Sequence, residues 1–577
     1  MSVFLTPEGR PFYGGTYFPP SARYGMPAFK DVLLAVIRAW RTRRDQVELS
    51  ASQVLELIGR AQATPPQPER ESPLSAETLD SAVRALIAEP DHLHGGWGAA
   101  PKFPQPMALE FLLRRHRSTG DAQTLAVATH TLEAMARGGI YDQIGGGFHR
   151  YSVDDHWLVP HFEKMLYDNA QLARVYLHAW QVTGNPLFRA IAQETLDYVA
   201  REMADARGGF YSTQDADSEG QEGKFFLWTL DEVRAVLGAQ TQSFAKAYPL
   251  SVQGNFEGRN ILSFAGTWEE REALASARRE LLKVREGRVR PGRDEKVLTS
   301  WNGLMLAAFA EGARAFGRDD YRQVAERNAD FLLRELRTGD GRLLHVWKAG
   351  QAKLTAYLED YSYLIEGLLA LYQATFEERW YLAARDLAEA MIAHFGAPDG
   401  RGFFDTADDH EGLITRPREL QDNAVPSGNA MAALALLHLA RLSLEPRYEE
   451  LAQRTFQQVR ELPSQHPLAF AQWLIALDYA LGRPREVAIV GAPGATDTQR
   501  LLDVCNQGYH PHQVVAVGVP CAEGCVIPLL RDRWQVKGRA TAYVCKDSLC
   551  HPPVIDPEEL RAMLGAGAPV AIKNELR

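Results

Sequence analysis

The stretch from Gly146 to Asn169, "GGFHRYSVDDHWLVPHFEKMLYDN", concentrates side chains that could carry acid–base chemistry. It holds three histidines, four carboxylates and five aromatic residues within 24 residues. Abstraction of a proton next to a carbonyl needs a base of near-neutral pKa and a partner acid, and histidine suits both roles. We therefore predict that this stretch forms part of a site. The structural alternative is that its carboxylates cap a helix and its histidines form ordinary hydrogen bonds.

The predicted acid–base pair is His161 with His149. A helix is expected to begin near Pro160, because proline is favoured in the first helical turn. A histidine and a glutamate in that turn would lie beside the loop that carries the second histidine. Glu163 or Asp142 would then orient one of the two imidazoles.

A second set of carboxylates lies in the glycine-containing loop at residues 212–228. Its spacing does not match an EF-hand, and a solvated turn is the structural alternative. Glycoside hydrolysis needs two carboxylates that flank the scissile bond. Asp215 with Asp217, or Asp360 with Asp142, could supply them, so a hydrolase is kept as an alternative function.

Three more predicted helix starts carry aromatic, amide and hydroxyl or acidic side chains. Tryptophan offers a stacking face and an amide offers directional hydrogen bonds, a combination that suits a sugar. Arginine and lysine are scarce in these clusters, and no P-loop or dinucleotide fingerprint accompanies them. We predict a carbohydrate substrate or ligand and no cofactor, with capped core helices as the structural alternative. The predicted substrate-binding residues are Trp301, Asn302, Tyr357, Asp360, Asn423 and Ser427.

Apolar residues recur with helical spacing through most of the chain. Twelve helices are expected, mostly as antiparallel pairs with tight turns, and the glycine-aromatic loops near residues 138, 207 and 400 form a weak internal repeat. Such pairs can close into a mainly α (α/α)6 toroid, whose long loops would surround a central cavity. An open solenoid is the alternative. The expected helices lie near residues 77–88, 105–118, 121–137, 161–183, 186–205, 301–317, 320–336, 357–376, 379–396, 427–443, 446–461 and 466–482.

The two ends of the chain differ from the helical middle. A β-hairpin and a helix are expected within residues 1–62, followed by a proline-rich linker at 63–76. The toroid is assigned to residues 77–483. Buried-type strands and helices at 484–577 predict a small α/β region.

Composition excludes several classes of protein. The net charge is −10 and no block of basic residues occurs, so we expect no nucleic-acid partner. No apolar run approaches 18 residues, so we expect no membrane span. The five cysteines all lie at or after Cys505 and are too loosely spaced for a zinc site. Ordinary thiols, no metal and a reducing cytoplasm are therefore predicted; the oligomeric state is left open.

Several blocks of the sequence resemble one known family, the thioredoxin-domain proteins related to bacterial YyaL and to spermatogenesis-associated protein 20. The blocks include "SVFLTPEGRPFYGGTYFPP", "GGWGAAPKFP", "STQDADSEGQEGKFFLW", "DEKVLTSWNGLM", "YLEDYSYLIEGLL" and "NAVPSGNA". The resemblance implies a thioredoxin-like domain with a Cys-x-x-Cys motif, then an (α/α)6 toroid similar to N-acylglucosamine 2-epimerases and six-hairpin glycosidases, then a small α/β region.

This sequence departs from that pattern at its start. It opens inside the last hairpin of the thioredoxin-like domain without a Cys-x-x-Cys motif, so a truncated chain or a misassigned start is expected. The first function predicted is a sugar epimerase or isomerase. A non-catalytic sugar-binding or scaffold module of a thioredoxin-fused protein is the alternative outside the enzyme class.

Overall fold

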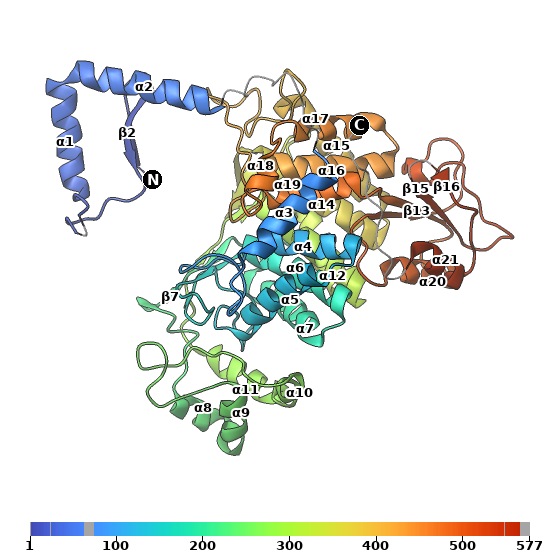
Figure 1. Ribbon diagram of the computed structural model, residues 1–577, viewed down its shortest axis with the longest axis horizontal. Coiled ribbons are helices and arrows are strands. Elements are labelled where there is room, and N and C mark those ends of the chain that lie inside the picture. Colours follow the sequence, from blue (N-terminus) through green and yellow to red (C-terminus); the bar gives the residue numbers. More distant parts are fainter. Residues whose placement is uncertain (1, 24, 63–73, 413, 547–548, 566–577) are drawn as a thin grey trace. The chain divides into compact units, whose positions relative to one another are not determined.

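The computed structural model describes residues 2–23, 25–62, 74–412, 414–546 and 549–565 (Figure 1). The chain divides into two compact units. Residues 1–71 and 404–418 form the first unit, and residues 72–403 and 419–577 form the second. Most of the predicted linker, residues 63–73, lies outside the described residues.

The first unit contains the predicted hairpin. Strands β1 (Ser2–Leu5) and β2 (Pro11–Gly15) pair antiparallel, with Phe4 opposite Tyr13. The predicted helix is α1 (Phe29–Thr42), and a second helix, α2 (Arg44–Gln62), follows it. In this unit the guanidinium groups of Arg416 and Arg418 lie over the Phe404 ring.

The second unit contains a closed ring of six helices, which confirms the predicted toroid. Each inner helix packs on the next, and the last, α19, packs on the first, α4, so the ring closes and an open solenoid is excluded. The inner helices are α4 (Pro106–Thr119), α6 (Leu166–Thr183), α12 (Thr299–Phe316), α14 (Leu358–Thr375), α16 (Gly428–Ser443) and α19 (Ala471–Leu481).

Six outer helices complete the hairpins. Inner helices such as α14 are buried on nearly all sides, whereas the outer ones bury one apolar face, as expected for the two layers. The outer helices are α3 (Ala76–Ala88), α5 (Ala122–Arg137), α7 (Pro186–Tyr198, continued by a π-helical turn at Val199–Met203), α13 (Asp319–Glu335), α15 (Glu378–Phe395) and α17 (Pro446–Phe456). A short helix, α18 (Leu462–Gln465), precedes α19.

Two glycines allow the closest approach between inner helices. A Cβ on Gly303 in α12 would lie 2.6 Å from the carbonyl carbon of Tyr363. A Cβ on Gly367 in α14 would lie 2.6 Å from the carbonyl oxygen of Gly303. Since real side chains do not tolerate such distances, these glycines allow the two backbones to touch.

The glycine-aromatic repeat corresponds to one hydrogen-bond pattern that recurs in three loops. In each copy an asparagine near the start of an inner helix accepts a hydrogen bond from the N–H of a loop phenylalanine and donates one to its C=O. These pairs are Asn169 with Phe148, Asn302 with Phe210, and Asn429 with Phe403. The weak repeat in the sequence therefore reflects how each loop is fastened to the ring.

The prediction that α6 begins near Pro160 is wrong. Residues 160–165 are extended, because their backbone pairs in two small sheets. Strand β3 (Tyr151–Ser152) pairs with β4 (Pro160–His161), and β5 (Lys164–Met165) pairs with β6 (Thr213–Gln214), which also pairs with β9 (Arg293–Asp294). The helix starts at Leu166, so His161 and Glu163 lie on the loop that leads into it.

The segment between α7 and α12 begins with a hairpin, β7 (Asp217–Ser218) and β8 (Gln221–Glu222). It continues as α8 (Leu230–Leu237), a 3-10 turn (Gly238–Gln240), α9 (Thr241–Ala247), α10 (Trp268–Ala273) and α11 (Ala275–Arg285). Helices α8, α9 and α11 share an apolar core. Arg271 and Arg278 bind Glu194 on α7, which attaches the segment to the outer layer of the ring.

Another small sheet lies beside α12 and α14. Its strands are β10 (Val297–Leu298), β11 (Leu344–Lys348) and β12 (Gln351–Thr355), in that order. The chain enters α12 directly from β10, and it enters α14 a few residues after β12. This sheet therefore helps to position the starts of two neighbouring inner helices.

The C-terminal α/β region is present as predicted. Its sheet has the order β14-β13-β15-β16, with β13 (Arg485–Val490) parallel to β14 (Gln513–Gly518) and antiparallel to β15 (Thr541–Lys546); β16 is Leu549–Cys550. Helices α20 (Thr496–Asn506) and α21 (Pro557–Leu564) complete it, with a 3-10 turn at Pro528–Leu530.

The prediction of ordinary thiols is wrong for four of the five cysteines. Cys521 is bonded to Cys525, and Cys545 to Cys550. Only Cys505, which is buried, is a free thiol. The sequence spacing did not reveal the pairing because β15 and β16 bring Cys545 opposite Cys550.

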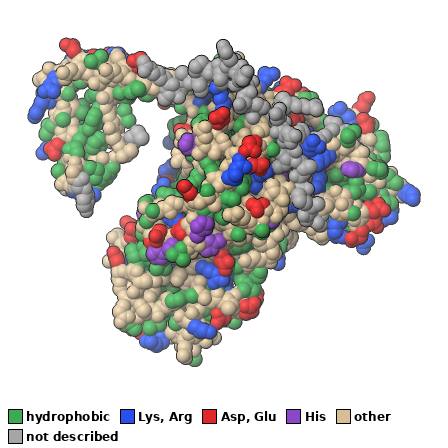
Figure 2. All heavy atoms as spheres, in the orientation of Figure 1, with side chains coloured by type: hydrophobic (Ala, Val, Ile, Leu, Met, Phe, Trp, Pro, Cys, Tyr) green, Lys and Arg blue, Asp and Glu red, His purple; other side chains and the backbone are tan. Residues whose placement is uncertain are grey.

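Two surface properties bear on possible partners. Among the described residues, no helix combines the length and the apolar character needed to cross a bilayer. On the face that Figure 2 shows, basic and acidic side chains are interspersed. The absence of a nucleic-acid partner and the cytoplasmic location stay predictions.

Candidate functional site

A set of polar and aromatic side chains lies where α6 and α12 begin and on the loops around α6. Contacts link its members into one chain, from an acidic hairpin at one end to an indole at the other. We call this set the rim cluster: Arg150, Tyr151, His161, Glu163, Tyr167, Glu222 and Trp301.

His161 lies at the centre of the rim cluster. Its Nδ1 lies 2.7 Å from Oε1 of Glu222, and its Nε2 lies 3.6 Å from Oε2 of Glu163. The imidazole stacks on Tyr151 with 5.1 Å between ring centroids, and its side chain is 30% exposed. A carboxylate that accepts the Nδ1 proton leaves Nε2 as the basic nitrogen. The geometry therefore leaves a partly exposed imidazole between two carboxylates.

The remaining contacts connect this imidazole to an aromatic surface. Arg150 donates to Glu163 at 3.1 Å and also hydrogen-bonds the Tyr167 hydroxyl. The Tyr167 ring meets Trp301 edge to face, with 4.7 Å between centroids. Trp301 is partly exposed, so one aromatic surface and one imidazole belong to the same contact network.

Two carboxyl groups near the rim cluster are biased toward their neutral forms. Burial, and then the charge of Asp360, raise the pKa of Glu359 to about 7, and its Oε1 lies 3.4 Å from the Ser300 hydroxyl. Burial also raises the pKa of Asp168 well above its usual range, and its Oδ2 has no hydrogen-bond partner among the described residues. A carboxyl that titrates near neutrality can donate a proton at pH 7.

His149, the predicted partner of His161, has the surroundings of a core residue. Its ring is 2% exposed and packs edge-on against Phe162 and Phe226. Its Nδ1 lies 2.9 Å from the carbonyl oxygen of Phe162. Burial, and then the charge of Lys164, lower its pKa to about 3. These surroundings give no support to His149 as a base.

Asp142 belongs to a buried ion cluster. Its two carboxylate oxygens accept from Arg285 at 2.8 and 2.9 Å, and Oδ2 also accepts from Lys164 at 2.9 Å. It makes no hydrogen bond to the imidazole of His149 or His161. This geometry does not support the prediction that Asp142 orients an imidazole.

Other predicted site residues act mainly as helix caps. Asp360 accepts from the backbone N–H groups of Ser300 and Tyr357, and it also contacts His345. Tyr357 packs edge-on against that imidazole. Both ends of the Asn302 amide are occupied by backbone groups, as described above. These positions support the structural alternative more than a substrate contact.

The last predicted positions are spread along loops. Asp215 and Asp217 are exposed, and Asp217 begins the β7–β8 hairpin. Asn423 is exposed, whereas Ser427 is buried and donates to the backbone carbonyl of Glu419. The structure therefore joins His161, Glu163 and Trp301 in one network and assigns the other predicted positions elsewhere.

Sequence reasoning missed a layer of charged side chains in the middle of the ring. We call it the ionic layer: Glu110, Arg174, His178, Glu311, Glu366 and His438, contributed by five inner helices. His178 lies 2.7 Å from Glu110 and 3.1 Å from Glu311. Arg174 donates twice to Glu311, and His438 lies 2.9 Å from Glu366. Charged residues within otherwise apolar helices were the available signal.

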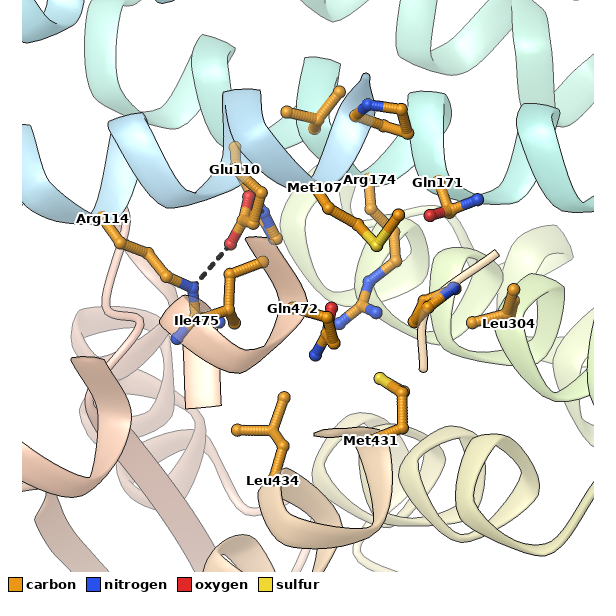
Figure 3. A pocket seen from close by; sticks show the side chains of 14 residues that line it. Met107, Glu110, Arg114, Gln171, Arg174, Leu304, Met431, Leu434, Gln472 and Ile475 are labelled. Carbon is orange, nitrogen blue, oxygen red and sulfur yellow. Dashed lines mark hydrogen bonds and ion pairs between the residues drawn. The ribbon is translucent and has the colours of Figure 1, made fainter. Parts of the chain in front are cut away.

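A small cavity separates the rim cluster from the ionic layer. Its volume is about 60 Å³, and its lining includes Gln171, Leu304, Met431 and Gln472 (Figure 3). Glu311 follows Trp301 by ten residues in α12, so the two levels are about 15 Å apart along the helix. Along the axis of the ring, the rim cluster therefore comes first, the small cavity second and the ionic layer third.

The ionic layer predicts a pH-dependent stability. Burial alone would lower the pKa of His178, but the charges of Glu110 and Glu311 raise it to about 8. Since the folded pKa exceeds the unfolded value of about 6.5, the charged imidazole stabilises the fold below that value, and the effect is lost as pH rises through about 8. The shift corresponds to about 2 kcal/mol.

Thermal unfolding from pH 6 to 9 tests this expectation. The difference in midpoint between the wild type and His178→Gln should be largest near pH 6 and should shrink toward pH 9. His92→Gln, at an exposed histidine, provides the control and should follow the wild type at every pH. A difference that stays constant with pH would contradict the expected charge on His178.

The second unit is an (α/α)6 toroid with a polar and aromatic site at the starts of its inner helices, fused to a small α/β region. Residues 1–59 match the family model Thioredox_DsbH, described as a protein of unknown function, DUF255. Human spermatogenesis-associated protein 20 is 34% identical over 621 aligned positions, covering 98% of this chain and 79% of the human protein. The chain belongs to the spermatogenesis-associated protein 20 family.

Other similar proteins extend the comparison. An uncharacterized protein of Caenorhabditis elegans is 28% identical, covering 98% of this chain and 83% of that protein. The solved structure of a cellobiose 2-epimerase from Spirochaeta thermophila is 16% identical with a TM-score of 0.45, covering 67% of this chain and 82% of that one. A D-mannose isomerase structure is 10% identical with a TM-score of 0.47, covering 70% and 95%.

Proposed function

We propose that this chain acts on a small reducing sugar as an epimerase or isomerase, with the rim cluster as its active site. One observation carries the proposal. An imidazole whose Nδ1 contacts a carboxylate lies in the same contact network as a partly exposed indole. The imidazole supplies a base, and the indole supplies the apolar face on which a sugar ring stacks.

The proposed reaction consists of proton transfers at the sugar carbonyl and at the carbon next to it. Nε2 of His161 removes the proton from the carbon next to the sugar carbonyl, while Glu222 holds Nδ1 and stabilises the imidazolium that forms. The neutral carboxyl of Glu359 donates a proton to the carbonyl oxygen, which yields an enediol. In an isomerisation, the imidazolium returns its proton to the former carbonyl carbon, and the Glu359 carboxylate takes the proton of the neighbouring enediol hydroxyl. In an epimerisation, Glu359 takes back the proton it gave, a water molecule supplies a proton to the opposite face of the carbon, and the imidazolium gives its proton to the hydroxide that remains.

The rim cluster favours proton transfer over glycoside hydrolysis. Two of the carboxylates first considered for hydrolysis are buried: Asp142 in an ion cluster, and Asp360 as a helix cap. Asp215 and Asp217 lie exposed on a loop. By contrast, a base and a neutral acid suffice for an enediol mechanism, and His161 and Glu359 are the candidates for these two roles.

Proton NMR of the purified protein with a panel of reducing sugars in heavy water tests the proposal. Deuterium at C2, or the anomeric signals of a second sugar, is the expected result. Saturable binding of a sugar that is recovered unchanged would support the binding module instead. Reducing ends released from glycans would support a hydrolase, and an absence of both binding and exchange across the panel would overturn the assignment to carbohydrates.

A further inference from the structure

A second cavity lies beyond the ionic layer, at the C-terminal ends of the inner helices. Its volume is about 80 Å³, and it lies between the ring and the segment from Cys505 to Gln513. Tyr509 from this segment donates to Glu110 at 2.6 Å, and His512 lies 2.7 Å from Asp478. We call this space the lower chamber. It shares Arg114, Arg174 and His178 with the cavity above and is distinct from the rim cluster.

The walls of the lower chamber hold one guanidinium that no side chain binds directly. Arg174 is paired with Glu311, and His178 is paired with both Glu311 and Glu110. Arg314 also lines the chamber and feels the charge of Glu311, but it makes no hydrogen bond or ion pair with any residue that the structure describes. A partly buried guanidinium without a partner costs free energy, unless an anion compensates it.

A second arginine presents an unused donor. Arg114 is 7% exposed and donates from Nε to Glu110 at 2.8 Å, while its Nη1 is buried without a hydrogen-bond partner in the described part of the chain. Guanidinium groups are planar donors that suit oxyanions. Arg114 and Arg314 therefore offer donors and charge to the same small space.

Acceptors in the chamber restrict the kind of anion. Oδ1 of Asn506 and Oε1 of Gln513 are buried without hydrogen-bond partners among the described residues. The imidazole of His510 is neutral at pH 7, because burial lowers its pKa to about 4. The carboxylates of Glu311 and Glu366 are the acidic groups in the lining. A ligand that carries both acceptor oxygens and an O–H donor matches this mixture.

We propose that the lower chamber binds phosphate, either as inorganic phosphate or as the phosphate group of a small monoester, through Arg314 and Arg114. A protonated phosphate oxygen can donate to Asn506 or Gln513, while the other oxygens accept from the arginines. A group the size of a water molecule needs roughly 15 Å³ of cavity, so the chamber can hold about five such groups. Phosphate has five non-hydrogen atoms and therefore fits. The site does not depend on sugar turnover at the rim cluster.

Isothermal titration of the full chain with inorganic phosphate, and separately with glycerol 3-phosphate, tests the proposal at constant ionic strength. Inorganic phosphate is expected to bind, and Arg314→Gln is expected to weaken it at least tenfold. Binding of glycerol 3-phosphate alone would identify the monoester as the ligand. Arg279→Gln, at an exposed arginine that forms no ion pair with any described residue, is the matched control and should bind like the wild type.

Thermal unfolding separates lost binding from lost folding. Phosphate should raise the unfolding midpoint of the wild type and of Arg279→Gln but not of Arg314→Gln. Without phosphate, Arg314→Gln should unfold no earlier than the wild type, because the substitution removes an unpaired charge. Equal phosphate binding by Arg314→Gln and the wild type, or no binding of either ligand by the wild type, would overturn the proposal.

Discussion

Replacing His161 with glutamine is expected to lower the rate of sugar epimerisation or isomerisation by about 10²–10⁴-fold, the usual contribution of a positioned general base. Glutamine preserves the length of the side chain and can still donate to Glu222, so the hairpin contact is retained. It cannot accept a proton at Nε2. The loss should therefore fall on kcat, with little change in KM or in the unfolding midpoint.

His156 provides the matched control for this experiment. It lies five residues earlier on the same loop, is 46% exposed, and has its Nδ1 2.9 Å from a carboxylate oxygen of Asp155. His156→Gln should retain the wild-type rate. If the two variants lose the same activity, the effect belongs to the loop as a whole. If neither loses activity, His161 is not the base.

The helices and their closure could be predicted because apolar periodicity determines which faces are buried. All twelve helical segments recur in the structure, and the first residue differs most at two of them, by five residues at α19 and by five at α6. There, residues 160–165 pair with strands as distant in sequence as Thr213–Gln214. The preference of proline for the first turn of a helix depends only on neighbouring residues. It cannot reveal a backbone partner some 50 residues away, and pairing with that partner keeps residues 160–165 extended.

The candidate site was only partly predictable for a related reason. The types and spacing of His161, Glu163 and Trp301 indicated chemistry, and the structure links them through Arg150 and Tyr167. Whether a polar side chain is a cap or a ligand contact depends on which backbone group reaches it. The amide of Asn302 is bound by a loop that lies about 90 residues earlier. That pairing is a property of the closed ring and has no local signature.

Replacing Asp142 with asparagine is expected to destabilise the second unit by about 3–5 kcal/mol, the usual cost of removing one partner from a buried ion cluster. The substitution keeps the shape of the side chain but leaves the charges of Arg285 and Lys164 buried without their carboxylate. That cost is a large fraction of a typical stability of about 5–15 kcal/mol. Thermal and urea unfolding measure it, and Asp319→Asn, at an exposed helix start, is the control that should change little.

The pH dependence of this deficit identifies its cause. Burial, which outweighs the charge of Asp142, lowers the pKa of Lys164 to about 8 in the wild type. Loss of the carboxylate should lower it further, so the folded variant sheds this proton at a lower pH while the unfolded chain keeps it up to about 10.4. The unfolded state then binds more protons, and stability must rise with pH. The folded wild type also loses this proton above about pH 8, so the deficit of Asp142→Asn should shrink as the pH rises toward about 8 and stay constant above it. A deficit that is constant with pH throughout would mean that the hydrogen bonds lost at Oδ2, rather than uncompensated charge, destabilise the variant.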